Sequence, residues 1–174
     1  MGAGPIGALV GVVAKHSGAS RIIISDFDQA RLEMAAKLGF DAVNSKEADL
    51  TQYVRQATNG DGADIVFECT GAESAALEMT TPCRTDGMIC LVGVHKPPHP
   101  VALADMHFRE LNMTATRVYT KRDFGQAVEL TQRISDELEL LISHVLPLSD
   151  CANVFDMIHD PQVPTVKVMV DCRR

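Results

Sequence analysis

The sequence has 174 residues, enough for one domain of ordinary size with its own hydrophobic core. Hydrophobic residues make up 46% of the chain, which excludes an intrinsically disordered protein, and no apolar run approaches the roughly 20 residues that a membrane-spanning helix needs. Acidic and basic residues are mixed along the chain and the formal net charge is −7, so neither nucleic acid nor a membrane is an expected partner.

Helices and strands are expected to alternate from the start of the chain. Residues 5–16 form the first predicted helix, because Pro5 suits the first helical turn and Gly18 provides a stop. The β-branched run 21–25, which is followed by Asp26, is typical of a buried parallel strand. Further helices are predicted at 28–38, 49–57 and 73–81, and further strands around 42–43 and at 65–67, 88–92 and 111–116.

The last third of the sequence is less regular. Residues 96–100 contain three prolines and are expected to form a surface loop. Helices are predicted at 124–134 and 153–159, and a strand at 166–170. We place a domain boundary near residue 120. The alternation of strands and helices before it predicts an α/β fold with a Rossmann-type, doubly wound parallel sheet, and 121–174 would be a C-terminal appendage.

A Gly-x-Gly-x-x-Gly motif opens the first helix. Gly2 would permit a tight turn, Gly4 a close approach of the backbone to a pyrophosphate, and Gly7 close packing of helix and strand. Pro5 and Ile6 begin the helix, whose free N–H groups and dipole attract anions. The motif alone is weak evidence, but its place before a helix and a strand strengthens it.

An aspartate stands where this kind of motif needs one. Asp26 ends the predicted strand about 20 residues after Gly7, in the position of the acid that binds the ribose of a dinucleotide. Its carboxylate would accept hydrogen bonds from both ribose hydroxyls and repel a 2′-phosphate, so we predict NAD rather than NADP. The alternative is that Asp26 caps the helix that starts near Asp28. We favour ribose binding because position and chemistry coincide.

Two further strand ends contain candidate residues for the same ligand. Parallel sheets bind ligands at the carboxyl ends of their strands, and here these ends are Cys69, Thr70 and Gly71 and then Val92, Gly93 and Val94. Their glycines would let a flat ring lie against the backbone. Glycine is also common where any strand passes into a loop, and this explains the two residues equally well. We interpret Cys69 as a buried strand-end residue rather than a nucleophile.

Cysteine and histidine residues give no metal-binding pattern. The five cysteines are widely spaced without a Cys-x-x-Cys pair, which suggests neither a zinc knuckle nor a disulfide framework and favours a reduced, cytoplasmic location. His95 and His99 flank the proline loop without a cysteine or carboxylate at ligand spacing, so we expect no metal site there.

The glycine motif normally follows a buried strand, yet only Met1 precedes Gly2. That strand is central in a doubly wound sheet. Its truncation would leave two neighbouring strands with unpaired backbone groups, each costing about 1–3 kcal/mol. We therefore expect the chain to be a fragment of a longer enzyme.

Six stretches resemble the zinc-type medium-chain alcohol dehydrogenases and, within them, the sorbitol (polyol) dehydrogenase branch. FECTGAE is specific to that branch, whereas GAGPIG is shared more widely. The resemblance covers essentially the whole chain. The stretches are GAGPIG at 2–7, SDFDQARLEMAAKLGFD at 25–41, FECTGAESA at 67–75, LVGV at 91–94, TRVYTKRDF at 116–124 and ISHVLPL at 142–148.

The resemblance implies roles for particular residues in binding NAD. Ile6 and its neighbours would contact the pyrophosphate, Asp26 the ribose, and Arg31 would flank the adenine, although without the resemblance Arg31 reads equally as a solvated charge on a helix. Val92, Gly93 and Val94 would line the nicotinamide, and Arg117 would lie near its ribose or the substrate, between Thr116 and Val118. This last stretch departs from the branch, because Val118 replaces an aromatic residue and two extra residues precede Phe124.

The resulting hypothesis is the NAD(H)-binding part of an oxidoreductase that transfers a hydride between a polyol or secondary alcohol and NAD. The resemblance places the catalytic zinc ligands in a preceding half, so we expect no catalytic or metal-binding residue in this chain and no activity from it alone. It also implies a homodimer or homotetramer. The alternative is a non-catalytic dinucleotide-binding or interaction module; an S-adenosyl cofactor is disfavoured by the FECTGAE and LVGV stretches.

Overall fold

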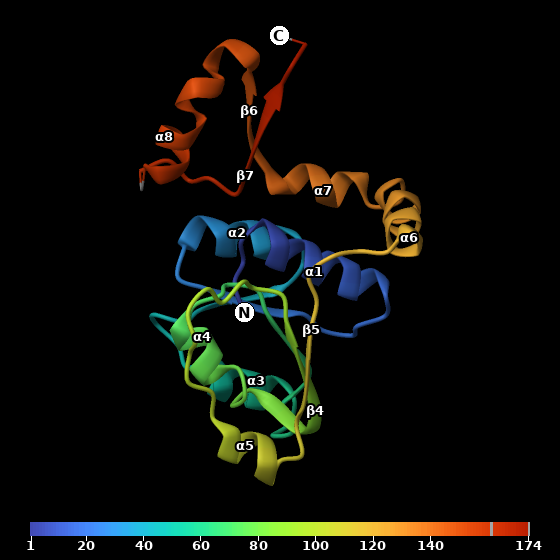
Figure 1. The fold of residues 1–174 in the computed structure, drawn as a ribbon, viewed down its shortest axis with the longest axis vertical. Coiled ribbons are helices and arrows are strands. Elements are labelled where there is room, and N and C mark those ends of the chain that lie inside the picture. Colours follow the sequence, from blue (N-terminus) through green and yellow to red (C-terminus); the bar gives the residue numbers. More distant parts are fainter. Residues whose placement is uncertain (161, 174) are drawn as a thin grey trace.

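The computed structural model describes residues 1–160 and 162–173 and is an α/β protein whose strands are parallel (Figure 1). The first part contains α1 (Pro5–His16), β1 (Ile23–Asp26), α2 (Gln29–Lys37), β2 (Asp41–Asn44), α3 (Leu50–Ala57), β3 (Ala63–Glu68), α4 (Glu73–Glu78), β4 (Cys83–Leu91), α5 (Leu103–Phe108) and β5 (Asn112–Ala115). The second part contains α6 (Lys121–Thr131), α7 (Ser135–Leu141), β6 (Ile142–Pro147), the 3-10 helix η1 (Leu148–Asn153), α8 (Val154–His159) and β7 (Lys167–Asp171).

Several element boundaries differ from the predicted ones for local reasons. α4 ends at Glu78 rather than near residue 81, because a residue that precedes a proline, here Pro82, is disfavoured in a helix. β4 begins at Cys83 instead of 88, and its polar residues around Asp86, which has φ 54°, hide the strand from a hydrophobicity pattern. α6 starts at Lys121 because Thr120 and Asp123 form a capping box. The sequence patterns do not predict α5, α7 or β6.

The parallel strands do not form one continuous sheet in the described residues. β1 pairs with β2, while β3, β4 and β5 form a second sheet in that order. A doubly wound sheet would have one more strand between β1 and β3. The interruption that the sequence predicts is therefore present.

Residues 1–3 bridge the interruption near the carboxyl ends of β1 and β3. The Gly2 N–H donates to the Ser25 carbonyl at 2.7 Å. The Met1 ammonium donates to the Phe67 carbonyl at 2.8 Å, and the Cys69 N–H donates to the Met1 carbonyl at 3.0 Å. Burial lowers the pKa of the Met1 amine below its ordinary value, because a charged group is poorly solvated between two strands.

Beyond this bridge the facing edges of β1 and β3 are open. Successive residues of a strand turn their backbone groups to alternate sides, and Ser25 and Phe67 are the bridge acceptors. Ile23 and Ser25 of β1, and Ile65 and Phe67 of β3, therefore face the gap. At the irregular start of β3 the Ala63 N–H instead donates to the Pro82 carbonyl on the β4 side, at 2.8 Å. It follows that no described strand lies beside the backbone N–H groups of Ile23 and Ile65 on this side. The Ile65 residue is 50% exposed.

The hydrophobic core is divided in the same way as the sheet. One cluster joins α1, α2 and β1 through residues such as Val12, Ile24 and Leu38. The other lies on β3 and β4 and includes Val66 and Ile89. Each half of the sheet thus has its own apolar packing.

The C-terminal segment attaches to the first cluster through α7. Ile134 and Leu141, at the two ends of this helix, are buried in the cluster, and α7 lies across α1 and α2 (Figure 1). The Glu137 carboxylate adds an ion pair to Lys15 at 2.8 Å and a hydrogen bond to Nε2 of His16 at 2.6 Å. Burial together with these contacts holds α7 against α1 and α2.

Beyond α7 the segment extends away from the rest of the molecule (Figure 1). β6 and β7 form a separate parallel pair, and η1 and α8 connect the two strands. Large apolar side chains are exposed here, including Val145 at 55% and Phe155 at 68%. Positions 161 and 174 of the predicted 121–174 segment lie outside the described residues.

We expect hydrogen exchange to reveal the open edges. In the 1–174 chain the amides of Ile23 and Ile65 should exchange faster than those of Ile24 and Val66, which face the paired strands β2 and β4. Residue-resolved exchange measured by NMR would test this. Protection of all four amides to the same degree would show that something else, such as a second copy of the chain, fills the gap.

Candidate functional site

The glycine motif lies where the carboxyl ends of β1 and β3 meet α1. Gly2 has φ 89°, and a Cβ there would lie 2.7 Å from Cγ2 of Thr70. A Cβ at Gly7 would collide with the backbone oxygen of Gly2. At Gly4, by contrast, a Cβ would meet only Nη1 of Arg31, at 3.9 Å. The turn is therefore closed on itself through Gly2 and Gly7 and leaves open space in front of Gly4.

The N-terminus of α1 offers hydrogen-bond donors that no side chain of residues 1–160 and 162–173 caps. The first N–H groups of an α-helix have no acceptor inside the helix, and here these include Ile6 and Gly7. No side chain caps α1, and its first turn contains no acidic residue. α2 and α3, in contrast, are capped by Asp28 and Asp49. This end of α1 is thus suited to an anion.

The Asp26 side chain holds the glycine turn to the end of β1. Its Oδ2 accepts the Ala3 N–H at 2.7 Å, and its Oδ1 accepts the N–H groups of Phe27 and Asp28 at 2.7 and 3.0 Å. The side chain is only 11% exposed. A carboxylate has about four acceptor positions, so one remains for a further donor beside the turn.

The Arg31 side chain lies beside this carboxylate and is 39% exposed. Its Nη1 is 3.7 Å from Oδ2 of Asp26, and its Nε is 3.8 Å from Oδ2 of Asp28. The Nε atom is buried and has no hydrogen-bond partner in the described chain. Asp28, rather than Asp26, caps α2, because Asp28 accepts the N–H groups of Ala30 and Arg31. The alternative role of Asp26 as that cap is therefore wrong.

The two strand ends that the sequence singles out separately lie side by side. The Val92 and Gly93 N–H groups both donate to the Glu68 carbonyl at 2.8 Å. A Cβ on Gly71 would lie 2.6 Å from the Val94 oxygen, and one on Gly93 would collide with the Gly71 nitrogen. The structure thus brings residues 69–71 and 92–94 into backbone contact.

Cys69 belongs to this strand end through its backbone. Its N–H bonds to Met1, and the thiol is partly buried. Burial raises the pKa of the Cys69 thiol above its ordinary value, so the thiol stays protonated at neutral pH. The thiol therefore lacks the thiolate character of a nucleophile.

Sequence reasoning missed a buried acid–base pair behind these turns. The Glu68 side chain is 0% exposed, and its Oε2 lies 2.8 Å from Nε2 of His95. Burial opposes ionisation, but hydrogen bonds from the Thr70 hydroxyl and from the Thr70 and Gly71 N–H groups outweigh it and hold the pKa of Glu68 below its usual range. A glutamate inside an otherwise apolar strand needs such partners, which is the signal that could have revealed it.

The last group of predicted site residues is only partly assembled. The Thr116 N–H donates to the Leu91 carbonyl at 3.0 Å, which continues β5 along β4. Val118 is 81% exposed, and Arg117 is also exposed. Within residues 1–160 and 162–173, no hydrogen bond or ion pair ties Arg117 to the other candidate residues.

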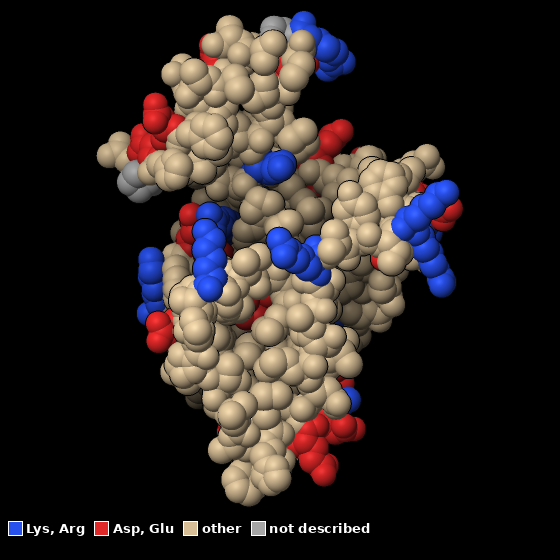
Figure 2. Space-filling model, in the orientation of Figure 1, with Lys and Arg blue, Asp and Glu red and all other residues tan. Residues whose placement is uncertain are grey.

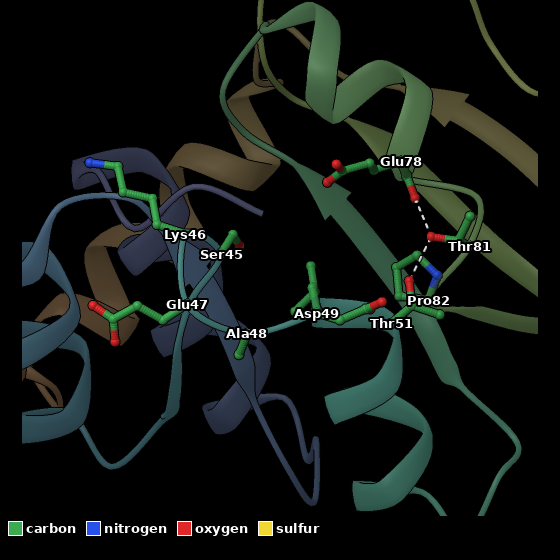
Figure 3. Close-up of a pocket in the computed structure, with 10 residues that line it drawn as sticks. Ser45, Lys46, Glu47, Ala48, Asp49, Thr51, Glu78, Thr81 and Pro82 are labelled. Carbon is green, nitrogen blue, oxygen red and sulfur yellow. Dashed lines mark hydrogen bonds between the residues drawn. The ribbon is translucent and has the colours of Figure 1, made fainter.

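A separate cavity of about 640 Å³ lies beside the loop that follows β2 (Figure 3). It lies between the loop after β2 and the turn before β4, where the Thr51 and Thr81 hydroxyl groups bond to each other. Ser45 lines it and donates its N–H to the Asp26 carbonyl at 3.2 Å. None of the predicted site residues is among its lining residues, so we assign no ligand to it.

The surface carries no concentration of one charge on the face that Figure 2 shows, where basic and acidic side chains are interspersed among uncharged ones. Among the described residues, no group of three or more His, Cys, Asp or Glu side chains could hold a metal ion. No helix in this part of the chain is long and apolar enough to cross a membrane.

Together, the fold and the site define an α/β domain with parallel strands and a glycine turn at the uncapped start of a helix. The chain belongs to the zinc-binding dehydrogenase family, whose model matches residues 5–133.

Individual proteins similar to this chain in sequence or structure support this family assignment. The chain is 38% identical over 173 residues to 2-dehydro-3-deoxy-L-galactonate 5-dehydrogenase of Pseudoalteromonas atlantica, covering 99% of this chain and 50% of that protein. It is 27% identical to D-xylulose reductase of Saccharomyces cerevisiae, covering 98% and 49%. A crystal structure of alcohol dehydrogenase from Thermotoga maritima superposes with a TM-score of 0.87 at 26% identity, covering 98% and 48%. The chain thus spans about half the length of the curated relatives it matches.

We expect Gly7→Ala to destabilise the protein, because the new methyl group would strike the Gly2 backbone, which cannot move aside as a side chain could. The loss should be about 1–3 kcal/mol in the free energy of unfolding, measured with denaturant. Gly125→Ala is the matched control, since Gly125 lies in α6 and a methyl group there meets nothing within 4 Å. It should be neutral or add about 0.5–1 kcal/mol. Equal effects of both changes would contradict the close packing of the turn.

Proposed function

We propose that this chain is the dinucleotide-binding part of a dehydrogenase and that its cofactor is NAD(H). One observation carries the proposal: the uncapped N-terminus of α1 faces open space at Gly4, beside the carboxylate of Asp26. A dinucleotide has an anionic pyrophosphate, which a helix N-terminus can bind, and a ribose diol, which a carboxylate can bind. The family membership and the dehydrogenase names of the relatives support the same function.

The residues present fit this cofactor. Its pyrophosphate would take the N–H groups of Ile6 and Gly7 and the space in front of Gly4, with Gly2 and Pro5 shaping the turn. A ribose hydroxyl would take the remaining acceptor position of Asp26, and Arg31 would flank the adenine. The nicotinamide would lie at the other strand ends, against Cys69, Thr70, Val92, Gly93 and Val94, with Thr116, Arg117 and Val118 near its ribose or the substrate.

We propose a polyol or secondary alcohol as substrate of the whole protein. When bound, NAD accepts or releases a hydride at the nicotinamide C4 atom. The residues of this chain would bind and orient the cofactor. The zinc that gives the family its name would have its ligands in the part of the protein outside this chain, since the described residues do not fit a metal ion.

The exposed apolar residues of the C-terminal segment support a role in assembly. Within this segment Phe124 and Phe155 are 56% and 68% exposed, and Val118 and Tyr119, just before the proposed boundary between 1–120 and 121–174, are 81% and 70% exposed. We propose that this segment packs against the remainder of the protein, and that the whole protein forms a homodimer or homotetramer. Free thiols at all five cysteines support a cytoplasmic location.

A second candidate function is a dinucleotide-binding module without catalysis. The site residues described above are those of binding and not of chemistry, which is the observation that favours it. Finding a zinc-binding half in the same natural polypeptide would exclude this alternative.

Exchanging the acid should alter cofactor choice. In the full natural protein, Asp26→Asn should weaken NADH binding roughly tenfold or more, because a charged acceptor for the ribose is lost. NADPH binding should change much less, since the same substitution removes a charge that repels its 2′-phosphate. Titration of NADH and NADPH fluorescence measures both affinities.

Asp28→Ser is the control for this change, because serine keeps a cap on α2 while it removes a charge two positions from Asp26. It should leave the ratio of NADH to NADPH affinity unchanged. If Asp26→Asn lowers both affinities equally, the ribose assignment is wrong.

Purified 1–174 should not oxidise polyols, even with zinc and NAD supplied. The proposal places the metal ligands elsewhere in the protein, so an alcohol would have nothing to lower its pKa before hydride transfer. Measuring NADH formation with sorbitol or xylitol checks this. Turnover above the level of heat-treated protein would show that the chemistry lies in this chain.

A further inference from the structure

A three-proline segment, residues 93–100, crosses the carboxyl ends of β3 and β4. It contains Gly93, Val94 and His95, and we call it the proline strap. His95 is 18% exposed and His99 is 11% exposed, so both rings lie against the protein. Their centroids are 5.3 Å apart in an edge-to-face arrangement. The strap includes the predicted surface loop 96–100, whose Lys96 and prolines are exposed, while the two histidine rings anchor it to the protein.

The Glu68 carboxylate fixes the strap to the neighbouring turn. Its Oε1 accepts the Thr70 hydroxyl and the Thr70 N–H, the latter at 2.7 Å, and the Gly71 N–H approaches both oxygens at 3.1 and 3.2 Å. Its Oε2 lies 2.8 Å from Nε2 of His95. One buried carboxylate therefore holds both the turn after β3 and the strap after β4.

The pair also determines that Nε2 is a ring nitrogen of His95 that carries a hydrogen. An ionised carboxylate only accepts hydrogen bonds, so Nε2 of His95 must carry a hydrogen and donate it. Nδ1 is buried and has no partner in the described residues, so nothing there replaces this single bond. The side-chain hydrogen bond by which His95 attaches the strap to the protein therefore depends on Glu68.

The backbone spacing depends on the same contacts. A Cβ at Gly93 would lie 2.5 Å from Oε2 of Glu68 and 2.9 Å from the Thr70 nitrogen. The Gly93 N–H also donates to the Glu68 carbonyl, so backbone and side chain of Glu68 both hold the start of the strap close to Gly71. Gly93 and Val94 are the positions at which the nicotinamide is proposed to rest.

We propose that Glu68 and His95 are positioning residues, which hold the proline strap so that Gly93 and Val94 form the nicotinamide end of the cofactor site. Neither side chain has to touch the cofactor. This inference rests on the proposed function, because it assigns the pair to one half of the proposed dinucleotide site. Among the hydrogen bonds of the described residues, none joins the side chains of this pair to Asp26 or the glycine turn, where the adenosine half is proposed to bind.

Two ligands separate the halves of the site: NADH, which occupies both, and ADP-ribose, which lacks the nicotinamide. In the full natural protein, His95→Leu should weaken NADH about tenfold, the effect of losing one hydrogen bond to a charged group, and leave ADP-ribose unchanged. His95→Gln, whose amide can still donate to Glu68, should restore most of the NADH affinity. Calorimetry measures both ligands, and thermal unfolding checks that each variant is folded.

His107→Leu is the matched control, because His107 is an exposed histidine in α5 with no hydrogen bond to the pair. It should change neither affinity. Hydrogen exchange without ligand gives an independent measurement: the strap amides should exchange faster in His95→Leu than in His95→Gln.

The possible results distinguish the two levels of the proposal. If the unmodified protein binds neither NADH nor ADP-ribose, the proposed function fails and the positioning role with it. If it binds both, and His95→Leu weakens both equally or neither, only the positioning role is overturned. If His95→Leu does not fold, two other variants test the positioning role. Glu68→Gln, which loses an acceptor, must weaken NADH binding more than ADP-ribose binding. His95→Gln must have little effect on the binding of either ligand.

Discussion

The hydrogen bonds of the first three residues are the constraint on which the site depends. They join a two-stranded and a three-stranded sheet that otherwise have separate cores. The same residues place Gly2 against Thr70 and bring the Ala3 N–H to Asp26. The glycine turn is thus both the proposed seat of a pyrophosphate and the connection between the two halves of the domain. Binding geometry and domain integrity share one set of backbone contacts.

Features with a local cause could be predicted from the sequence. α1 follows from Pro5 and its apolar residues, β1 from a β-branched run, and the interruption of the sheet from the absence of an apolar run before Gly2. Asp26 was located by its spacing from Gly7. In each of these cases a few neighbouring residues determine the structure, so pattern and propensity are sufficient.

Features that depend on distant residues could not be predicted. The Glu68–His95 pair joins residues 27 positions apart, and β6 is defined by its pairing with β7 and not by its own pattern. α7 is short, and its place is set by burial of Ile134 and Leu141 against α1 and α2. Residue type alone does not identify the cap of α2, because Asp26 and Asp28 are equally good capping residues. Only the backbone geometry shows that Asp28 is the cap.

The missing cap of α1 has a consequence for how the domain would respond to its ligand. α2 and α3 carry their own aspartate caps, so these helices are complete as the chain folds. α1 is left for an external anion to complete, and a group that binds only the folded state stabilises it in proportion to its concentration and affinity. The concentration of the cofactor would then influence the lifetime of the protein, because the form without cofactor would unfold and be degraded sooner than the form with cofactor bound.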